Sequence, residues 1–367
     1  MSLNNKKRIV VKVGSSLIAP NGNGCSTHYL LAIAQFIIKC RARGQQIVLV
    51  SSGSVAAGRK WFDTSEMTVT LKKAMSAAGQ SDMMEMWEKL VDFPTAQLLL
   101  TNADLCNRER YLSIRDTLEA CLEHGVLPIV NENDTVTADH LKVGDNDNLS
   151  AMVATSINAD ALIMCTDVDG LFDSNPIKNK DAKLIQVVQE IDDAVYKMAG
   201  GATSSTGTGG MQTKIEAAEK ATSHGIDTFI INGHRSQAFE SLLAGENPGT
   251  HFLAFEVPIP SALHWMTHTV KARGEVIVDE SEIDINAMKD SITGSSILSV
   301  KGDFAVGDTI VLTNQDGKRI VKAKSNYSSC LLNYLADEDI RERLDEDSHL
   351  LNHSIISQEH MAVLEDS

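Results

Sequence analysis

Apolar runs alternate with helical patterns over the first two thirds of the chain. Runs rich in Val, Ile and Leu predict strands, and apolar residues between them recur at helical spacing. The predicted strands begin at Arg8 and Gln46 and cover residues 97–101, 126–130, 161–166 and 227–232. The predicted helices cover residues 30–44, 71–91, 108–123, 149–157 and 215–223. This alternation predicts an α/β fold with an open, mostly parallel sheet sandwiched by helices and ligands at the carboxyl ends of its strands.

The pattern changes after Pro258. Residues 1–258 form the predicted first domain, residues 259–273 a linker broken by prolines, and residues 274–367 a smaller domain with an acidic C-terminal segment. In that last part, short apolar runs are separated by glycine-containing turns, which predicts a β-rich domain. Its predicted strands are Glu275–Ile277, Ser296–Val300, Thr309–Leu312 and Ile320–Lys324.

Short amides and acids gather between residues 131 and 151, after a predicted strand and before a predicted helix. The segment reads NENDTVTADHLKVGDNDNLSA. A solvated turn is the plain interpretation, because Asn and Asp are common in turns. Two such clusters at the carboxyl end of a strand favour a polar ligand site instead.

Lys12 interrupts the first apolar strand two residues before Gly14. A lysine inside a central strand is costly unless its ammonium reaches a site at the strand end, although an edge strand would also tolerate it. The strand that begins at Gln46 likewise runs into a loop of small residues, Ser51–Ser54, which suits a carboxylate or a phosphate.

A glycine-rich segment, GGATSSTGTGGMQTK, ends at Lys214 and leads into a helix. It has neither the spacing of a P-loop nor that of a dinucleotide-binding fingerprint. Either it is a glycine linker, or it covers phosphates with Lys214 as a point charge at the helix start.

Composition narrows the class of protein. The formal net charge of −16 opposes binding to nucleic acid or to anionic membranes. Residues 273–367 hold nine Lys or Arg and 19 Asp or Glu, so most of the excess negative charge lies there. We expect a cytoplasmic protein, because the six cysteines are scattered and the sequence shows neither a signal peptide nor a membrane-spanning apolar run.

Six segments together resemble the amino-acid kinase family, and the last domain resembles a PUA domain. The segments are VVKVGSS, SSGSVAAGR, NENDTV, KVGDNDNLSA, TDVDGLF and GTGGMQTK, and the resemblance covers residues 8 to about 330. It implies the amino-acid kinase fold. More narrowly, it implies ATP-dependent phosphorylation of the side-chain carboxylate of L-glutamate to L-glutamyl 5-phosphate, the first step of proline biosynthesis. At the C-terminus the chain departs from such PUA domains, because residues 337–347 form an acidic run.

The resemblance also implies roles for individual residues. Lys12, Lys214 and Asp147 are the expected catalytic residues, with Asp147 holding the two ammonium groups. Ser52, Asp134 and Asn146 are expected to bind L-glutamate, and Asp134 suits its ammonium group. The nucleotide is expected to contact Lys12, Thr166, Asp167, Thr208, Gly209, Gly210, Met211, Gln212, Thr213 and Lys214.

The expected ligands are ATP and Mg²⁺. Because Mg²⁺ prefers phosphates and water, no protein ligand is assigned to it, and Asp145 is a candidate for an indirect contact. Proline is the expected feedback inhibitor, sensed by the loop 135–142 with His140, and the family implies a homo-oligomer, either a dimer or a tetramer. Two alternatives remain open: an amino-acid kinase for another acid or a phosphate, and a nucleic-acid-binding regulator that uses the PUA-like domain.

Overall fold

The chain divides into two compact units, each with its own sheet. The computed structural model describes residues 3–137, 146–200, 210–255, 270, 272–279, 292–336 and 354–364. The units are Met1–Ile259 and Pro260–Ser367. Their apolar cores are separate, since one cluster of buried side chains lies wholly in the first unit and another wholly in the second.

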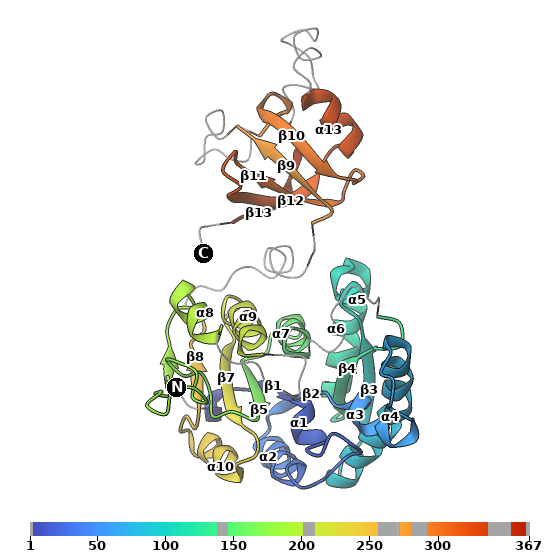
Figure 1. Ribbon diagram of the computed structural model, residues 1–367, viewed down its shortest axis with the longest axis vertical. Helices are drawn as coiled ribbons and strands as arrows, with labels where there is room; N and C mark the ends of the chain where they lie inside the picture. Colours follow the sequence, from blue (N-terminus) through green and yellow to red (C-terminus); the bar gives the residue numbers. More distant parts are fainter. Residues whose placement is uncertain are drawn as a thin grey trace. The chain divides into compact units, whose positions relative to one another are not determined.

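An eight-stranded sheet forms the centre of the first unit, in the order β3-β4-β2-β1-β5-β7-β8-β6 (Figure 1). Neighbouring strands run parallel except for β7 and β8, so the predicted open, mostly parallel sheet is confirmed. The strands are β1 (Arg8–Val13), β2 (Gln46–Ser51), β3 (Thr95–Leu100), β4 (Leu127–Glu132), β5 (Ala161–Thr166), β6 (Val187–Val188), β7 (Asp227–Asn232) and β8 (Thr250–Phe252).

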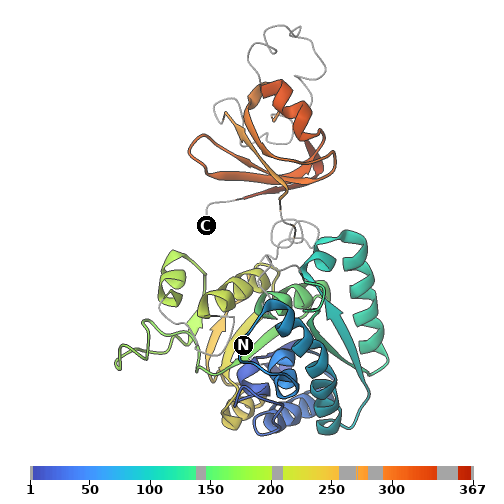
Figure 2. The same cartoon turned by 45° about the vertical axis from the view of Figure 1, so that its right-hand side comes forward.

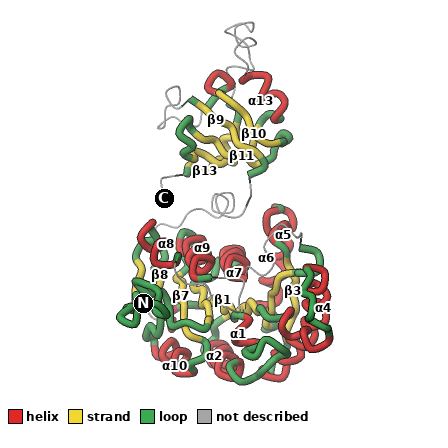
Figure 3. The backbone as a smooth tube through the Cα atoms, in the orientation of Figure 1, coloured by secondary structure: helices red, strands yellow, loops and turns green. Residues whose placement is uncertain are grey.

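Helices cover both faces of this sheet. Figure 3 shows α6, α7 and α9 on one face and α2 and α10 on the other. The helices of the first unit are α1 (Ser15–Ile18), α2 (Leu30–Ala42), α3 (Ser54–Gly58), α4 (Val69–Leu90), α5 (Asn102–Cys106), α6 (Arg108–Glu123), α7 (Asn146–Ser156), α8 (Asp193–Ala199), α9 (Met211–Thr222) and α10 (Ser236–Ala244). The described part of this unit also contains two short 3-10 helices, η1 (Leu3–Asn5) and η2 (Arg59–Trp61).

Alternation along β1 decides where its lysine lies. Ile9, Val11 and Val13 belong to the core cluster that also contains residues of α2 and α10. Successive side chains of a strand point to opposite faces, so Lys12 lies on the other face, the one that α7 and α9 cover. The lysine therefore reaches the layer in which α7 begins.

Several boundaries differ from the predicted ones. Strand β4 continues through Asn131 and Glu132, beyond the predicted end at Val130, because both residues pair with β3. Helix α4 begins at Val69, after the N-cap Thr68, whose side chain accepts a hydrogen bond from the backbone of Leu71. Helices α5, α8 and α10 and strands β6 and β8 were not predicted, and each of them is short, with nine residues or fewer.

The second unit contains a five-stranded sheet in the order β10-β9-β11-β12-β13. Figure 2 shows this sheet in orange and red. Among the described residues of this unit, the strands are β9 (Gly274–Val278), β10 (Ile297–Gly302), β11 (Thr309–Thr313), β12 (Arg319–Ser325) and β13 (Ile356–Val363), and the helices are η6 (Gly294–Ser296) and α13 (Ser329–Ala336). The four predicted strands are present. The fifth, β13, pairs antiparallel with β12, so the domain ends in a strand despite the acidic run before it.

Helices α3 and α4 approach so closely that their contact excludes any side chain. A Cβ on Gly79 would lie 2.0 Å from the carbonyl oxygen of Ser54 and 2.3 Å from the amide nitrogen of Gly58. A Cβ on Gly58 would lie 1.9 Å from the carbonyl oxygen of Met75. The absence of a side chain at Gly58 and Gly79 thus allows α4 to pack directly against α3 and the loop after β2.

We expect Gly79→Ala to lower the free energy of unfolding by on the order of 3 kcal/mol, because backbone atoms must move to admit the methyl group. Urea denaturation measures this change. Gly200→Ala is the control, since its Cβ would meet its nearest described neighbour at an ordinary 3.7 Å. Equal stability of the two variants would contradict the tight contact between α3 and α4.

Candidate active site

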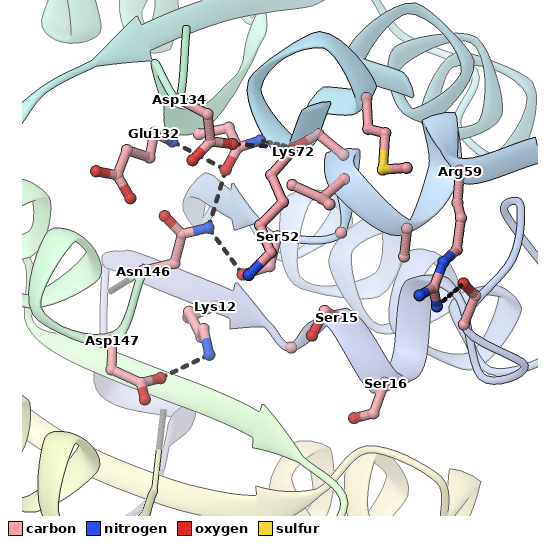
Figure 4. Close-up of a pocket in the computed structure, with 18 of the residues that line it drawn as sticks. Lys12, Ser15, Ser16, Ser52, Arg59, Lys72, Glu132, Asp134, Asn146 and Asp147 are labelled. Carbon is pink, nitrogen blue, oxygen red and sulfur yellow. Dashed lines mark hydrogen bonds and ion pairs between the residues drawn. The ribbon is translucent and has the colours of Figure 1, made fainter. Parts of the chain in front are cut away.

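A pocket of about 340 Å³ lies at the carboxyl ends of β1, β2, β4 and β5. Loops after parallel strands meet at this edge of a sheet, where α/β proteins bind their ligands. Its lining includes Lys12, Ser52, Asp134, Asn146, Asp147, Thr166, Asp167 and Lys214, all of which the sequence singled out. Figure 4 shows Asn146 between the Lys12–Asp147 pair and Asp134.

Two lysines flank the Asp147 carboxylate at one end of the pocket. Lys12 Nζ lies 2.6 Å from Asp147 Oδ1, and Lys214 Nζ lies 3.1 Å from Asp147 Oδ2. Lys12 comes from the end of β1, Asp147 from the first turn of α7 and Lys214 from the first turn of α9. The Thr213 hydroxyl also donates to Asp147 Oδ2, at 2.9 Å.

All three charged side chains are almost completely buried, with exposures of 2–7%. Burial alone would raise the pKa of Asp147, but the charges of Lys12 and Lys214 outweigh it and hold that pKa well below its usual range. Burial lowers the pKa of Lys214, and Asp147 opposes that shift. The cluster therefore holds an ionised carboxylate between two lysine side chains in a site shielded from water.

A second carboxylate, Asp134, marks the other end of the pocket. Ser76 donates to its Oδ2 at 2.6 Å and Ser54 at 3.3 Å. Burial raises the pKa of Asp134, and the two serine hydrogen bonds oppose that rise. Among the described residues no cation pairs with Asp134, so a positively charged ligand group suits this end of the pocket.

Amide side chains connect the two ends. Asn146 Nδ2 donates to Ser52 Oγ at 2.8 Å and to Asn131 Oδ1 at 2.9 Å. Asn131 Nδ2 in turn donates to Gln80 Oε1, also at 2.9 Å. The predicted substrate residues Ser52 and Asn146 are thus in direct contact, and α4 supports them through Gln80.

The predicted nucleotide residues are only partly brought to the pocket. Thr166 and Asp167 line it, and the Thr166 hydroxyl donates to Asp167 at 3.0 Å. Gly210, Met211 and Thr213 stand at the start of α9 beside Lys214. Gln212 is exposed and bonds Glu216 on its own helix, away from the pocket lining. Thr208, Gly209, Asp145 and His140 lie outside the described residues.

Sequence reasoning missed three residues of α4. Ser76 contacts Asp134, Gln80 contacts Asn131, and the exposed Lys72 lines the pocket. Ser76 and Gln80 are four residues apart and so share one face of the helix, but α4 carries many other polar residues, so this spacing was only a weak signal. Met75 and Met83 of that helix are buried in the core.

The side chains of the pocket are compatible with a metal ion that is bound mainly by a nucleotide and not by the protein. Among the described residues, no group of three His, Cys, Asp or Glu side chains is arranged to hold one. Asp147 is already satisfied by its two lysines. Mg²⁺ needs no protein cage, because it keeps several waters and binds mainly to nucleotide phosphates.

Comparison with known proteins identifies the class. Residues 7–232 match the model of the amino acid kinase family, and residues 274–335 match the PUA domain. The chain belongs to the amino acid kinase family, with a PUA domain after the kinase domain.

Within that family, the curated proteins similar to this chain include glutamate 5-kinases. "Glutamate 5-kinase 1" of Pseudoalteromonas translucida is 56% identical over 99% of both chains. "Glutamate 5-kinase" of Idiomarina loihiensis is 50% identical over 98% of both chains. A solved UMP kinase from Bacillus anthracis, at 16% identity and a TM-score of 0.47, covers 68% of this chain and 96% of its own.

Proposed function

We propose that this enzyme is a glutamate 5-kinase, which transfers the γ-phosphoryl group of ATP to the side-chain carboxylate of L-glutamate and produces L-glutamyl 5-phosphate, the first step of proline biosynthesis. The observation that carries the proposal is the buried Lys12–Asp147–Lys214 cluster, which shares one pocket with the amide and carboxylate side chains around Asp134. The whole-chain identity to glutamate 5-kinases supports the choice of substrate.

The chemistry of this reaction suits the site. Phosphoryl transfer depends mainly on positioning and on neutralising charge. Lys12 and Lys214 would stabilise the charge on the transferring group, and Asp147 would keep their ammonium groups in place. The attacking carboxylate of the substrate ordinarily titrates near pH ~4.3, so it is already ionised at neutral pH and no general base is required.

Recognition of L-glutamate would fall to the other end of the pocket. Asp134 would bind the α-ammonium group, and the Ser52 hydroxyl, which Asn146 contacts, would bind a carboxylate. Thr166, Asp167 and the start of α9 with Lys214 would hold the nucleotide. Mg²⁺, bound to the ATP phosphates, would supply further neutralisation of charge when present.

Trapping of the acyl phosphate tests the function directly. Incubation with L-glutamate, ATP, Mg²⁺ and hydroxylamine is expected to yield the γ-hydroxamate, because hydroxylamine intercepts a labile acyl phosphate. Aspartate and N-acetylglutamate are the controls, the first shorter and the second without a free ammonium group for Asp134. Equal product from N-acetylglutamate would point to a different kinase of the family.

Proline is the proposed feedback inhibitor. It carries an α-carboxylate and a secondary ammonium group, so it suits the Asp134 and Ser52 end of the pocket. We expect inhibition that is competitive with L-glutamate, so the proline concentration for half-inhibition should rise in proportion to glutamate above its KM. Inhibition that did not respond to glutamate would place proline elsewhere.

The remaining proposals concern partners and compartment. We propose a homo-oligomer, a dimer or a tetramer, as the family resemblance implies. A cytoplasmic location agrees with six free cysteines, although only Cys40 and Cys165 are fully buried. Among the described residues, no helix is both long and apolar enough to span a membrane. The acidic second unit argues against nucleic acid as a partner.

A further inference from the structure

The backbone fixes which way the Asn131 amide faces. Its Oδ1 accepts a hydrogen bond from the backbone N–H of Glu132 at 2.9 Å. A backbone N–H can only donate, so this atom must be the oxygen. The Asn131 Nδ2 therefore faces the other way, toward Gln80 Oε1 at 2.9 Å and, less closely, Ser54 Oγ at 3.3 Å.

That orientation is passed on to Asn146. Because Asn131 presents an oxygen, Asn146 must present its Nδ2, which lies 2.9 Å from that oxygen. The same Nδ2 donates to Ser52 Oγ at 2.8 Å. A reversed Asn146 amide would place two acceptors against each other at the Asn131 contact.

The consequence reaches the pocket through Ser52. Its hydroxyl oxygen accepts from Asn146, which leaves the hydroxyl proton to be donated to another group. Ser52 lines the pocket, whereas Gln80 stands behind Asn131 on α4 and is not part of the lining. Gln80 is buried, with an exposure of 8%.

We propose that Gln80 is a positioning residue for the substrate carboxylate. The backbone of Glu132 sets the direction of the Asn131 amide, and Gln80 holds that amide in place from its nitrogen side. Through Asn131 and Asn146, this contact keeps the Ser52 hydroxyl available as a donor to that carboxylate. A hydroxyl that donates to an anionic oxygen makes a stronger hydrogen bond than one between neutral groups. This inference rests on the proposed function, and it adds a residue of α4 to the recognition of L-glutamate.

A double-mutant cycle on the full-length enzyme tests the inference. The dissociation constant of L-glutamate is measured by calorimetry for the unaltered enzyme, Gln80→Met, Ser52→Ala and the double variant. Each single variant is expected to weaken binding about tenfold, the size of one hydrogen bond to a charged group. The double variant is expected to bind no more than about twofold more weakly than Ser52→Ala, because both changes remove the same contact.

Gln45→Met is the matched control. Gln45 is also 8% exposed, but its amide donates to the backbone carbonyls of Leu3 and Lys6, far from the pocket. Its replacement is expected to leave the dissociation constant within about twofold, alone or combined with Ser52→Ala. The inference would be overturned if Gln80→Met left the dissociation constant of L-glutamate unchanged. It would also be overturned if the factors by which Gln80→Met and Ser52→Ala each raise that constant multiplied in the double variant.

A second variant covers the case in which Gln80→Met fails to fold. Gln80→Glu keeps an acceptor oxygen for Asn131 and is expected to bind L-glutamate within about threefold of the unaltered enzyme. A tenfold loss in folded Gln80→Glu would contradict the relay. Failure of the proposed function is recognised separately, because the unaltered enzyme would then form no hydroxamate from L-glutamate.

Discussion

Replacement of Lys12 or Lys214 by alanine is expected to lower kcat by about 10²-fold or more, while binding of L-glutamate is largely retained. Each change removes one of the two buried lysine side chains that pair with Asp147 and that we propose stabilise the transferring phosphoryl group. Charges interact strongly in such a water-poor site, so the loss of either lysine is costly. The remaining lysine cannot replace it, because its own ammonium group is held at a different oxygen of Asp147. Steady-state kinetics with ATP and L-glutamate measure the effect.

The control for this experiment is Lys89→Ala. Lys89 lies on α4 and is 70% exposed, and its ion-pair partner among the described residues is Glu85, a contact worth little at a surface. The Lys89 variant is expected to keep the full kcat. Near-normal turnover in Lys12→Ala or Lys214→Ala would exclude that lysine from the catalytic role.

Replacement of Asp134 by alanine is expected to damage the use of L-glutamate far more than the use of ATP. An ammonium–carboxylate contact in a desolvated site is worth about 2–4 kcal/mol, so kcat/KM for L-glutamate should fall about 30- to 1000-fold. The KM for ATP should change little, because Asp134 lies at the far end of the pocket from Asp147 (Figure 4). A rise confined to the ATP KM would show that Asp134 serves the nucleotide.

The raised pKa of Asp134 gives this prediction a pH dependence. Burial stabilises the protonated form of the carboxyl, but only its ionised form attracts an ammonium group. The KM for L-glutamate should therefore rise as the pH falls through the raised pKa. Asp134→Asn should have a high KM for L-glutamate at every pH. Dividing the KM of the unaltered enzyme by that of Asp134→Asn at each pH removes the contribution from titration of the substrate itself.

The part of the site that could be predicted consists of residues that break a local pattern. Lys12 stands out because a charge within an apolar central strand is costly without a partner, and the structure provides that partner in Asp147. The polar segment after residue 130 was recognised for the same reason. Its individual residues were not separable by pattern, and the choice of Asp147 over Asp145 depended on the family resemblance.

The unpredicted part consists of residues that fit their local pattern. Ser76 and Gln80 are ordinary residues of a long helix, and nothing local shows that their face meets Asn131 and Asp134. That contact depends on Gly58 and Gly79, which allow α4 to approach the loop after β2. Long-range packing of this kind is set by tertiary structure and leaves only a weak trace in the sequence.

The order in which the chain is made has a consequence for the lysine–carboxylate cluster. Translation produces Lys12 and then Asp147 well before Lys214, so a nascent chain that lacks α9 has a carboxylate with a single ammonium partner. Strand β7 then follows α9 and pairs beside β5, which brings the central sheet together only late in synthesis. A nascent chain from which α9 and β7 have not yet emerged is thus expected to be unable to use ATP, and catalytic competence begins only once the kinase unit is nearly complete.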